Sequence, residues 1–73
     1  MSRLLDVRGL PPCEPFDRIL AATDELPFGE ALEVLIHREP LPLYEWLAEH
    51  GFGHRTVQES SEQFRIFIHH LPS

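Results

Sequence analysis

The sequence predicts an α/β two-layer sandwich of order β-α-β-α-β-β, with a four-stranded mixed sheet and both helices on one face. Three observations lead to this fold class. Apolar residues recur at helical spacing in two segments and alternate along the last segment, as in a half-exposed strand. Proline and glycine separate these segments. Right-handed β-α-β crossovers then place both helices on the same face of the sheet.

The first predicted strand, residues 4–7, runs into a turn. Gly9 tolerates dihedral angles that other residues avoid, and the prolines after it fix φ. A helix is predicted over residues 14–25, with Pro15 in its first turn, where a missing N–H costs nothing. The residues expected on its buried face are Phe16, Ile19, Leu20, Thr23 and Leu26.

A second strand is predicted at residues 31–36, where the apolar composition favours a central position in the sheet. A second helix over residues 43–50 follows. Phe16 and Trp46 are expected to be buried, because each is the largest residue on the apolar face of its helix. The last third forms a hairpin, with strands over residues 55–59 and 63–69.

The open face of the sheet is expected to carry an apolar patch. Leu35 and Phe67 are predicted to point away from the helices, beside Glu33, Arg65 and His69. An apolar spot with a charged rim suits a protein–protein contact. We therefore expect a protein partner, or a homodimer formed through the open face.

The composition limits the classes of function. Seventy-three residues make one small domain, residues 1–73. The formal charge of −6, with 12 acidic residues against 6 arginines, disfavours nucleic acid and anionic membranes as partners. The absence of lysine excludes Schiff-base chemistry on a lysine. A single cysteine, no signal-peptide pattern and no apolar run of membrane-spanning length favour a cytoplasmic protein.

The most informative segment is Leu-Asp-Val-Arg-Gly-Leu-Pro-Pro-Cys-Glu-Pro at residues 5–15. Cys13 precedes the first helix, where the helix dipole and free N–H groups lower a thiol pKa, so it is the candidate catalytic residue. The alternative is that Cys13 only fills the turn. For Asp6 and Arg8 a structural role is favoured over a catalytic one, with Arg8 holding the turn by binding either backbone carbonyls or Asp6. The predicted partner-binding residues are Asp6, Arg8, Gly9, Pro12, Cys13, Glu14 and Pro15.

This segment resembles the TusA/SirA sulfur-carrier superfamily. Residues 26–32, Leu-Pro-Phe-Gly-Glu-Ala-Leu, are similar to that family's passage from the first helix to the second strand. Residues 42–47, Pro-Leu-Tyr-Glu-Trp-Leu, resemble its uncharacterised domain-of-unknown-function (DUF) branch. The resemblance implies a TusA-like fold and a link to sulfur or redox metabolism. The family's persulfide cysteine aligns with Pro12, so Cys13 is displaced by one residue, a rotation of about 100° near a helix start.

The leading hypothesis is a small cytoplasmic, non-enzymatic carrier or protein-interaction module that presents residues 8–15 to a partner. No cofactor or bound metal is expected, because the chain lacks metal-binding spacing, a phosphate loop and a nucleophile elbow. One alternative is a sulfur transferase that carries a persulfide on Cys13. Another is a metal or small-ligand sensor that uses His37, His69 and His70.

Overall fold

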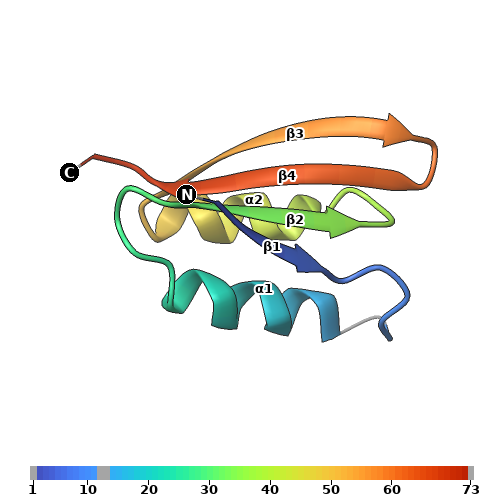
Figure 1. Cartoon of the computed structure of the whole chain (residues 1–73), viewed down its shortest axis with the longest axis horizontal. Helices are drawn as coiled ribbons and strands as arrows, with labels where there is room; N and C mark the ends of the chain where they lie inside the picture. The colour runs from blue at the N-terminus through green and yellow to red at the C-terminus, as the bar shows by residue number, and fades with distance from the viewer. Residues whose placement is uncertain (1, 12–13, 73) are drawn as a thin grey trace.

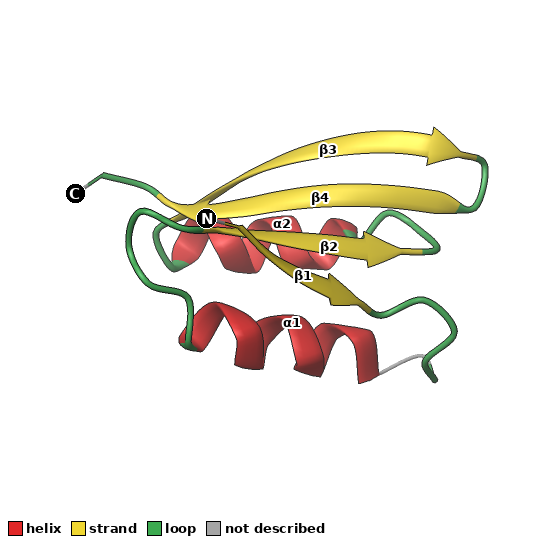
Figure 2. Cartoon of the chain, in the orientation of Figure 1, coloured by secondary structure: helices red, strands yellow, loops and turns green. Residues whose placement is uncertain are grey.

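The computed structural model describes residues 2–11 and 14–72, and it confirms the predicted α/β architecture (Figure 1). The sheet has the order β1-β2-β4-β3. Strands β1 and β2 are parallel, whereas β4 is antiparallel to both β2 and β3. Both helices lie on one face of the sheet (Figure 2). The elements are β1 (Ser2–Asp6), α1 (Glu14–Asp24), β2 (Ala31–Ile36), α2 (Leu41–Glu49), β3 (Phe52–Ser60) and β4 (Gln63–His70).

The hydrophobic core fills the space between the sheet and the two helices. Strands β2 and β4 present alternate residues to it, because Val34 pairs with Ile66 and Leu32 pairs with Ile68 in the antiparallel register. This is the alternation that the sequence predicts for a half-exposed strand. The side chains with no exposed surface in the core are Val7, Ile19, Val34, Leu43, Leu47, Ile66 and Ile68.

Three elements begin earlier than the sequence suggests, and the first of them is β1, which begins at Ser2 instead of residue 4. Helix α2 begins at Leu41, two residues before the predicted start, because a proline is well tolerated in the first turn of a helix. Strand β3 begins at Phe52 instead of residue 55. Gly51 turns the chain with φ of 81°, and Phe52 is then already paired with His70. Gly53 lies inside the strand, opposite His69.

The prediction that Phe16 and Trp46 are buried is only partly correct. Both side chains are half-buried and pack against the edge of the core. The aliphatic residues Ile19, Leu43 and Leu47 fill the helix–sheet interface instead. The Trp46 ring stacks on His50 at a centroid distance of 4.1 Å, outside the fully buried region. Branched aliphatic side chains thus fill this layer, and the rings of Phe16 and Trp46 lie at its rim.

Candidate functional site

One end of the molecule collects the features that are typical of ligand sites in α/β sheets. The carboxyl ends of β1 and β2 and the first turns of α1 and α2 lie there, opposite the two chain termini (Figure 1). Ligands of open α/β sheets bind outside the carboxyl ends of the strands. The candidate site is therefore built from the turn after β1 and the loop between β2 and α2.

Arg8 holds the turn after β1 through an ion pair with Asp6. Arg8 Nε donates to Asp6 Oδ1 over 2.9 Å, and Arg8 Nη2 donates to Asp6 Oδ2 over 2.8 Å. The backbone N–H of Arg8 also donates to Asp6 Oδ1 over 3.0 Å. These bonds from Arg8 lower the pKa of Asp6 to about 2, and the carboxylate raises the pKa of Arg8. The predicted structural pairing of Asp6 and Arg8 is confirmed.

The remaining nitrogen of Arg8 reaches another strand. Arg8 Nη1 donates to Gln63 Oε1 on β4 over 2.9 Å, although β2 lies between β1 and β4 in the sheet. Gly9 follows at φ of 80°, a left-handed conformation that glycine adopts without steric cost. The turn is thus exposed but fixed at its base. We call this set of bonds among Asp6, Arg8 and Gln63 the Arg8 clamp.

Polar side chains continue from the Arg8 clamp across the open face of the sheet. Gln63 Nε2 donates to Glu59 Oε1 over 2.7 Å, and Arg65 Nε donates to Glu59 Oε2 over 3.1 Å. Arg65 also pairs with Glu33 on β2. Residues from all four strands and the first turn are therefore joined in one network, which contains three carboxylates and two guanidinium groups.

This network makes the apolar patch on the open face smaller than the sequence suggests. Leu35 does point to the open face, but it is only 8% exposed and lies in register between Asp6 and Arg65. The Arg55 guanidinium lies 5.0 Å from the centre of the Phe67 ring. Leu4 stays 64% exposed on the outer strand. A homodimer through this face remains a prediction, which sedimentation of the wild type and of Leu4→Glu would measure.

The start of α1 supplies the other part of the predicted site. The backbone N–H of Glu14 donates to the carbonyl of Pro11 over 3.0 Å, and the Glu14 carboxylate pairs with Arg18 at 3.1 Å. Pro15 is buried and lines a pocket. Pro12 and Cys13, which the sequence places in the same site, lie outside the described residues.

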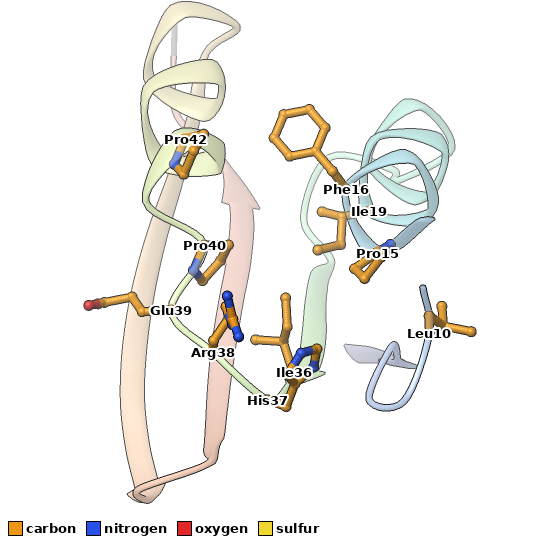
Figure 3. Close-up of a pocket in the computed structure, with 10 residues that line it drawn as sticks. All are labelled: Leu10, Pro15, Phe16, Ile19, Ile36, His37, Arg38, Glu39, Pro40 and Pro42. Carbon is orange, nitrogen blue, oxygen red and sulfur yellow. The ribbon is translucent and has the colours of Figure 1, made fainter. Parts of the chain in front are cut away.

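The pocket opens between α1 and the loop that joins β2 to α2 (Figure 3). Its volume is about 290 Å³. The apolar part of its wall consists of prolines and the side chains of Leu10, Phe16, Ile19 and Ile36. The polar part consists of His37, Arg38 and Glu39. The pocket thus combines an apolar slot with a few polar groups at one side, which is the usual composition of small-molecule sites.

The polar residues of the pocket differ in their contacts. Glu39 extends away from the other labelled side chains in Figure 3, and its Oε2 accepts a hydrogen bond from the Tyr44 hydroxyl at 3.1 Å. Burial raises the pKa of Tyr44, so this hydroxyl stays protonated at neutral pH. Within the described residues, Arg38 makes no ion pair and His37 Nδ1 is buried without a hydrogen-bond partner.

This pocket was not predicted from the sequence. Residues 37–40 lie in a connecting loop that shows no periodicity, and the prolines at positions 40 and 42 indicated only a turn. The predicted topology nevertheless indicates where a pocket could form. Two parallel strands joined by a helix bring their carboxyl ends to one edge, so the residues after each strand converge there.

The three histidines of the proposed sensor are not brought together. His37 directly follows β2, whereas His69 pairs with Ala31 at the opposite end of the same strand. Six residues of extended chain separate these positions by about 20 Å. His70 Nε2 hydrogen-bonds to the Leu26 carbonyl at 2.6 Å and the ring stacks on Phe28 at 4.0 Å, so it holds a loop in place.

Within residues 2–11 and 14–72, no three histidine, cysteine, aspartate or glutamate side chains are grouped so that they could hold a metal ion. In the same part of the chain, no helix has the length and apolar character needed to cross a membrane.

Comparison with known proteins identified one family. The model of a family described as "Uncharacterized conserved protein (DUF2249)" matches residues 4–70, which include both the Arg8 clamp and the pocket. No match to the chain was found among curated proteins or among solved structures.

Proposed function

The chain belongs to the DUF2249 family of uncharacterised conserved proteins, and on that premise we propose that it is a small cytoplasmic, non-enzymatic carrier or protein-interaction module. Its contact surface for a protein partner is the turn and helix start over residues 8–15. The sequence resemblance of this segment to TusA/SirA sulfur carriers supports sulfur or redox metabolism as the context of the interaction.

The observation that carries this proposal is the Arg8 clamp. Asp6 and Gln63 hold the Arg8 side chain from two different strands, while Arg8, Gly9 and Pro11 remain exposed. A loop that is fixed before binding loses little conformational entropy when a partner binds, so more of the contact energy appears as affinity.

Site-specific photo-crosslinking tests this proposal. A benzophenone amino acid replaces Pro11 in the exposed turn, or Leu71 at the opposite end of the molecule as the matched control. We expect discrete protein adducts in cells from position 11 and none from position 71. Adding Arg8→Ala is expected to weaken the adducts from position 11. The same adducts from both positions, or none from position 11, would contradict the proposal.

A second candidate function is sulfur transfer through Cys13. It is supported by the position of the cysteine in the sequence, between Pro11 and Glu14, which are joined by a backbone hydrogen bond at the candidate site. In this reaction the Cys13 thiolate attacks the outer sulfur of a donor persulfide. The sulfur–sulfur bond of the donor breaks, and the donor cysteine leaves as a thiolate.

Mass spectrometry distinguishes the two candidates. The chain is incubated with a cysteine desulfurase and cysteine, and the mass is compared with that of Cys13→Ser and Cys13→Pro. If Cys13 only fills the turn, we expect no added sulfur, and Cys13→Pro keeps its crosslinks. A single added sulfur atom that disappears in Cys13→Ser would establish the persulfide carrier instead.

A further inference from the structure

We propose that the pocket between α1 and the β2–α2 loop binds a small amphiphilic carboxylate, with the apolar body of the ligand in the slot and its carboxylate on Arg38. This inference goes beyond the proposed function, because it concerns a small molecule and requires no protein partner. It rests on the contacts of the arginines, on the composition of the pocket wall and on the charge of the chain.

Arg38 differs from the other arginines of the chain in its contacts. Four of the six arginines are paired with acidic side chains: Arg3 with Glu30, Arg8 with Asp6, Arg18 with Glu14, and Arg65 with Glu33 and Glu59. Arg55 lies over the ring of Phe67. Arg38 lines the pocket without an acidic or aromatic partner within the described residues. The Arg38 guanidinium can therefore bind an anionic ligand at the pocket without first breaking an ion pair with a described residue.

The nearest acidic residue in the sequence does not neutralise Arg38. Glu39 follows it directly, but the Glu39 carboxylate accepts a hydrogen bond from Tyr44, which is held by Thr56 at 2.5 Å. In Figure 3 the two side chains diverge, with Glu39 directed away from the labelled cluster and Arg38 on the side of Pro40 and Ile36. Within the described residues, Arg38 therefore forms no ion pair with the acidic residue that follows it on the loop.

His37 adds a second unmet polar group to the same wall. Its Nδ1 atom is buried and has no hydrogen-bond partner within the described residues. A buried polar atom in this condition has lost its hydrogen bonds to water, and a hydrogen bond to a ligand would restore one of them. Among the residues that the structure describes, two adjacent loop residues thus provide a guanidinium without an ion pair and an imidazole nitrogen without a hydrogen bond, and both residues line the same cavity.

The apolar wall decides what kind of anion fits. Phe16, Ile19 and Ile36 and the neighbouring prolines offer no hydrogen bonds, so the larger part of the ligand must be apolar. One guanidinium matches one carboxylate through two parallel hydrogen bonds. A phosphate or a polyanion needs several donors or cations, whereas the wall holds one arginine and the chain carries a net charge of −6.

The volume of the pocket limits the size of the ligand. At about 290 Å³ it lies at the lower end of the range for small-molecule sites. A phenyl ring or a short alkyl chain with a terminal carboxylate is of suitable size. We therefore choose 3-phenylpropionate as the probe and its neutral amide, 3-phenylpropanamide, as the matched compound without charge.

Titration of the full chain, followed by amide chemical shifts, tests the inference. We expect 3-phenylpropionate to shift the signals of residues 36–42 and of the first turn of α1, and the amide to bind about tenfold more weakly. Arg38→Gln is expected to bring the affinity for the acid down to that for the amide. Arg55→Gln removes an equal charge on the other side of the sheet and is expected to leave the affinity unchanged.

The dispersion of the same spectra shows whether each variant is folded. The inference would be overturned by equal affinity for acid and amide, or by an affinity for the acid that is unchanged in Arg38→Gln. It would also be overturned by shifts confined to other parts of the chain, or by no binding up to the solubility limit of the probe. The tripeptide N-acetyl-Gly-Gly-Phe is the last probe, and we expect it to bind no more tightly than 3-phenylpropionate. An affinity for the tripeptide ten times that for 3-phenylpropionate would overturn the inference of a small-molecule ligand and indicate that the pocket binds the carboxyl terminus of a protein.

Discussion

Arg8 Nη1 donates a hydrogen bond over 2.9 Å to the side-chain carbonyl of Gln63, which lies 55 positions later in the chain. The bond spans the width of β2, because Arg8 follows β1 and Gln63 begins β4. The same guanidinium holds both carboxylate oxygens of Asp6. One side chain therefore connects the turn that we propose as the contact surface to two strands of the sheet.

Removal of the clamp is expected to loosen the turn. In Arg8→Ala the Asp6 carboxylate loses both contacts from the Arg8 side chain, so the amide of residue 8 is held less firmly against Asp6 Oδ1. We predict faster hydrogen exchange at residues 8–11 with little change in the core strands. Arg3→Ala, which breaks an exposed ion pair with Glu30, is the control and leaves exchange at residues 8–11 unchanged.

The clamp also predicts a pH dependence. The pKa of Asp6 in the folded chain is about 2, below the ordinary value of 3.8, because Arg8 stabilises the ionised form. The contribution of the clamp to stability is therefore complete above the ordinary value and is lost as the pH falls from 3.8 to about 2. A carboxyl-detected NMR titration measures this pKa directly. In Arg8→Ala we expect it to return toward 3.8, and an unchanged low value would show that Arg8 is not its cause.

The helix–sheet interface is expected to depend on aliphatic residues more than on tryptophan. Leu47 has no exposed surface, so Leu47→Ala leaves a cavity and is predicted to lower the free energy of unfolding by about 2–5 kcal/mol. Trp46 is half-buried at the edge of the core, and Trp46→Ala is predicted to cost less than Leu47→Ala. Urea unfolding of the two variants measures the difference. The opposite order would place Trp46 deeper in the core than the structure does.

Gly53 and His69 are predicted to be energetically coupled. A Cβ added at Gly53 would lie 2.7 Å from His69 Nε2 and 2.8 Å from Leu71 Cδ2, so both side chains must move in Gly53→Ala. The substitution is expected to cost less when His69→Ala has already removed the ring. A double-mutant cycle on the free energy of unfolding is predicted to give a coupling of about 0.5 kcal/mol or more. Strict additivity would show that the ring moves aside freely.

The sequence predicts the layers of the fold because they depend on local periodicity. The alternation along β4 assigns Ile66 and Ile68 to the core, and the helical spacing in α1 assigns Ile19 to it. The early start of β3 is missed because Gly51 and Gly53 resemble a loop when read locally. Only the pairing of Phe52 with His70 extends the strand through them.

The site is predicted less completely than the fold. The ion pair of Asp6 with Arg8 lies within two residues and can be inferred from the sequence. The bond from Arg8 to Gln63 depends on strand order, and no local pattern contains it. Arg38 is recognised only when the three-dimensional contacts of the described residues are compared, because the other arginines pair with carboxylates or lie over a ring and Arg38 has no such partner among them.

The strand order also has a consequence for synthesis on the ribosome. Strand β1 emerges first, but its neighbour β2 begins at Ala31, and the acceptor for Arg8 is the first residue of β4. Local contacts such as the β3–β4 hairpin form quickly, whereas pairing between distant segments is slow. A nascent chain that is interrupted before Gln63 has no acceptor for Arg8 Nη1. The turn after β1 is consequently clamped only after the first residue of β4 has been synthesised, although its own residues emerge much earlier.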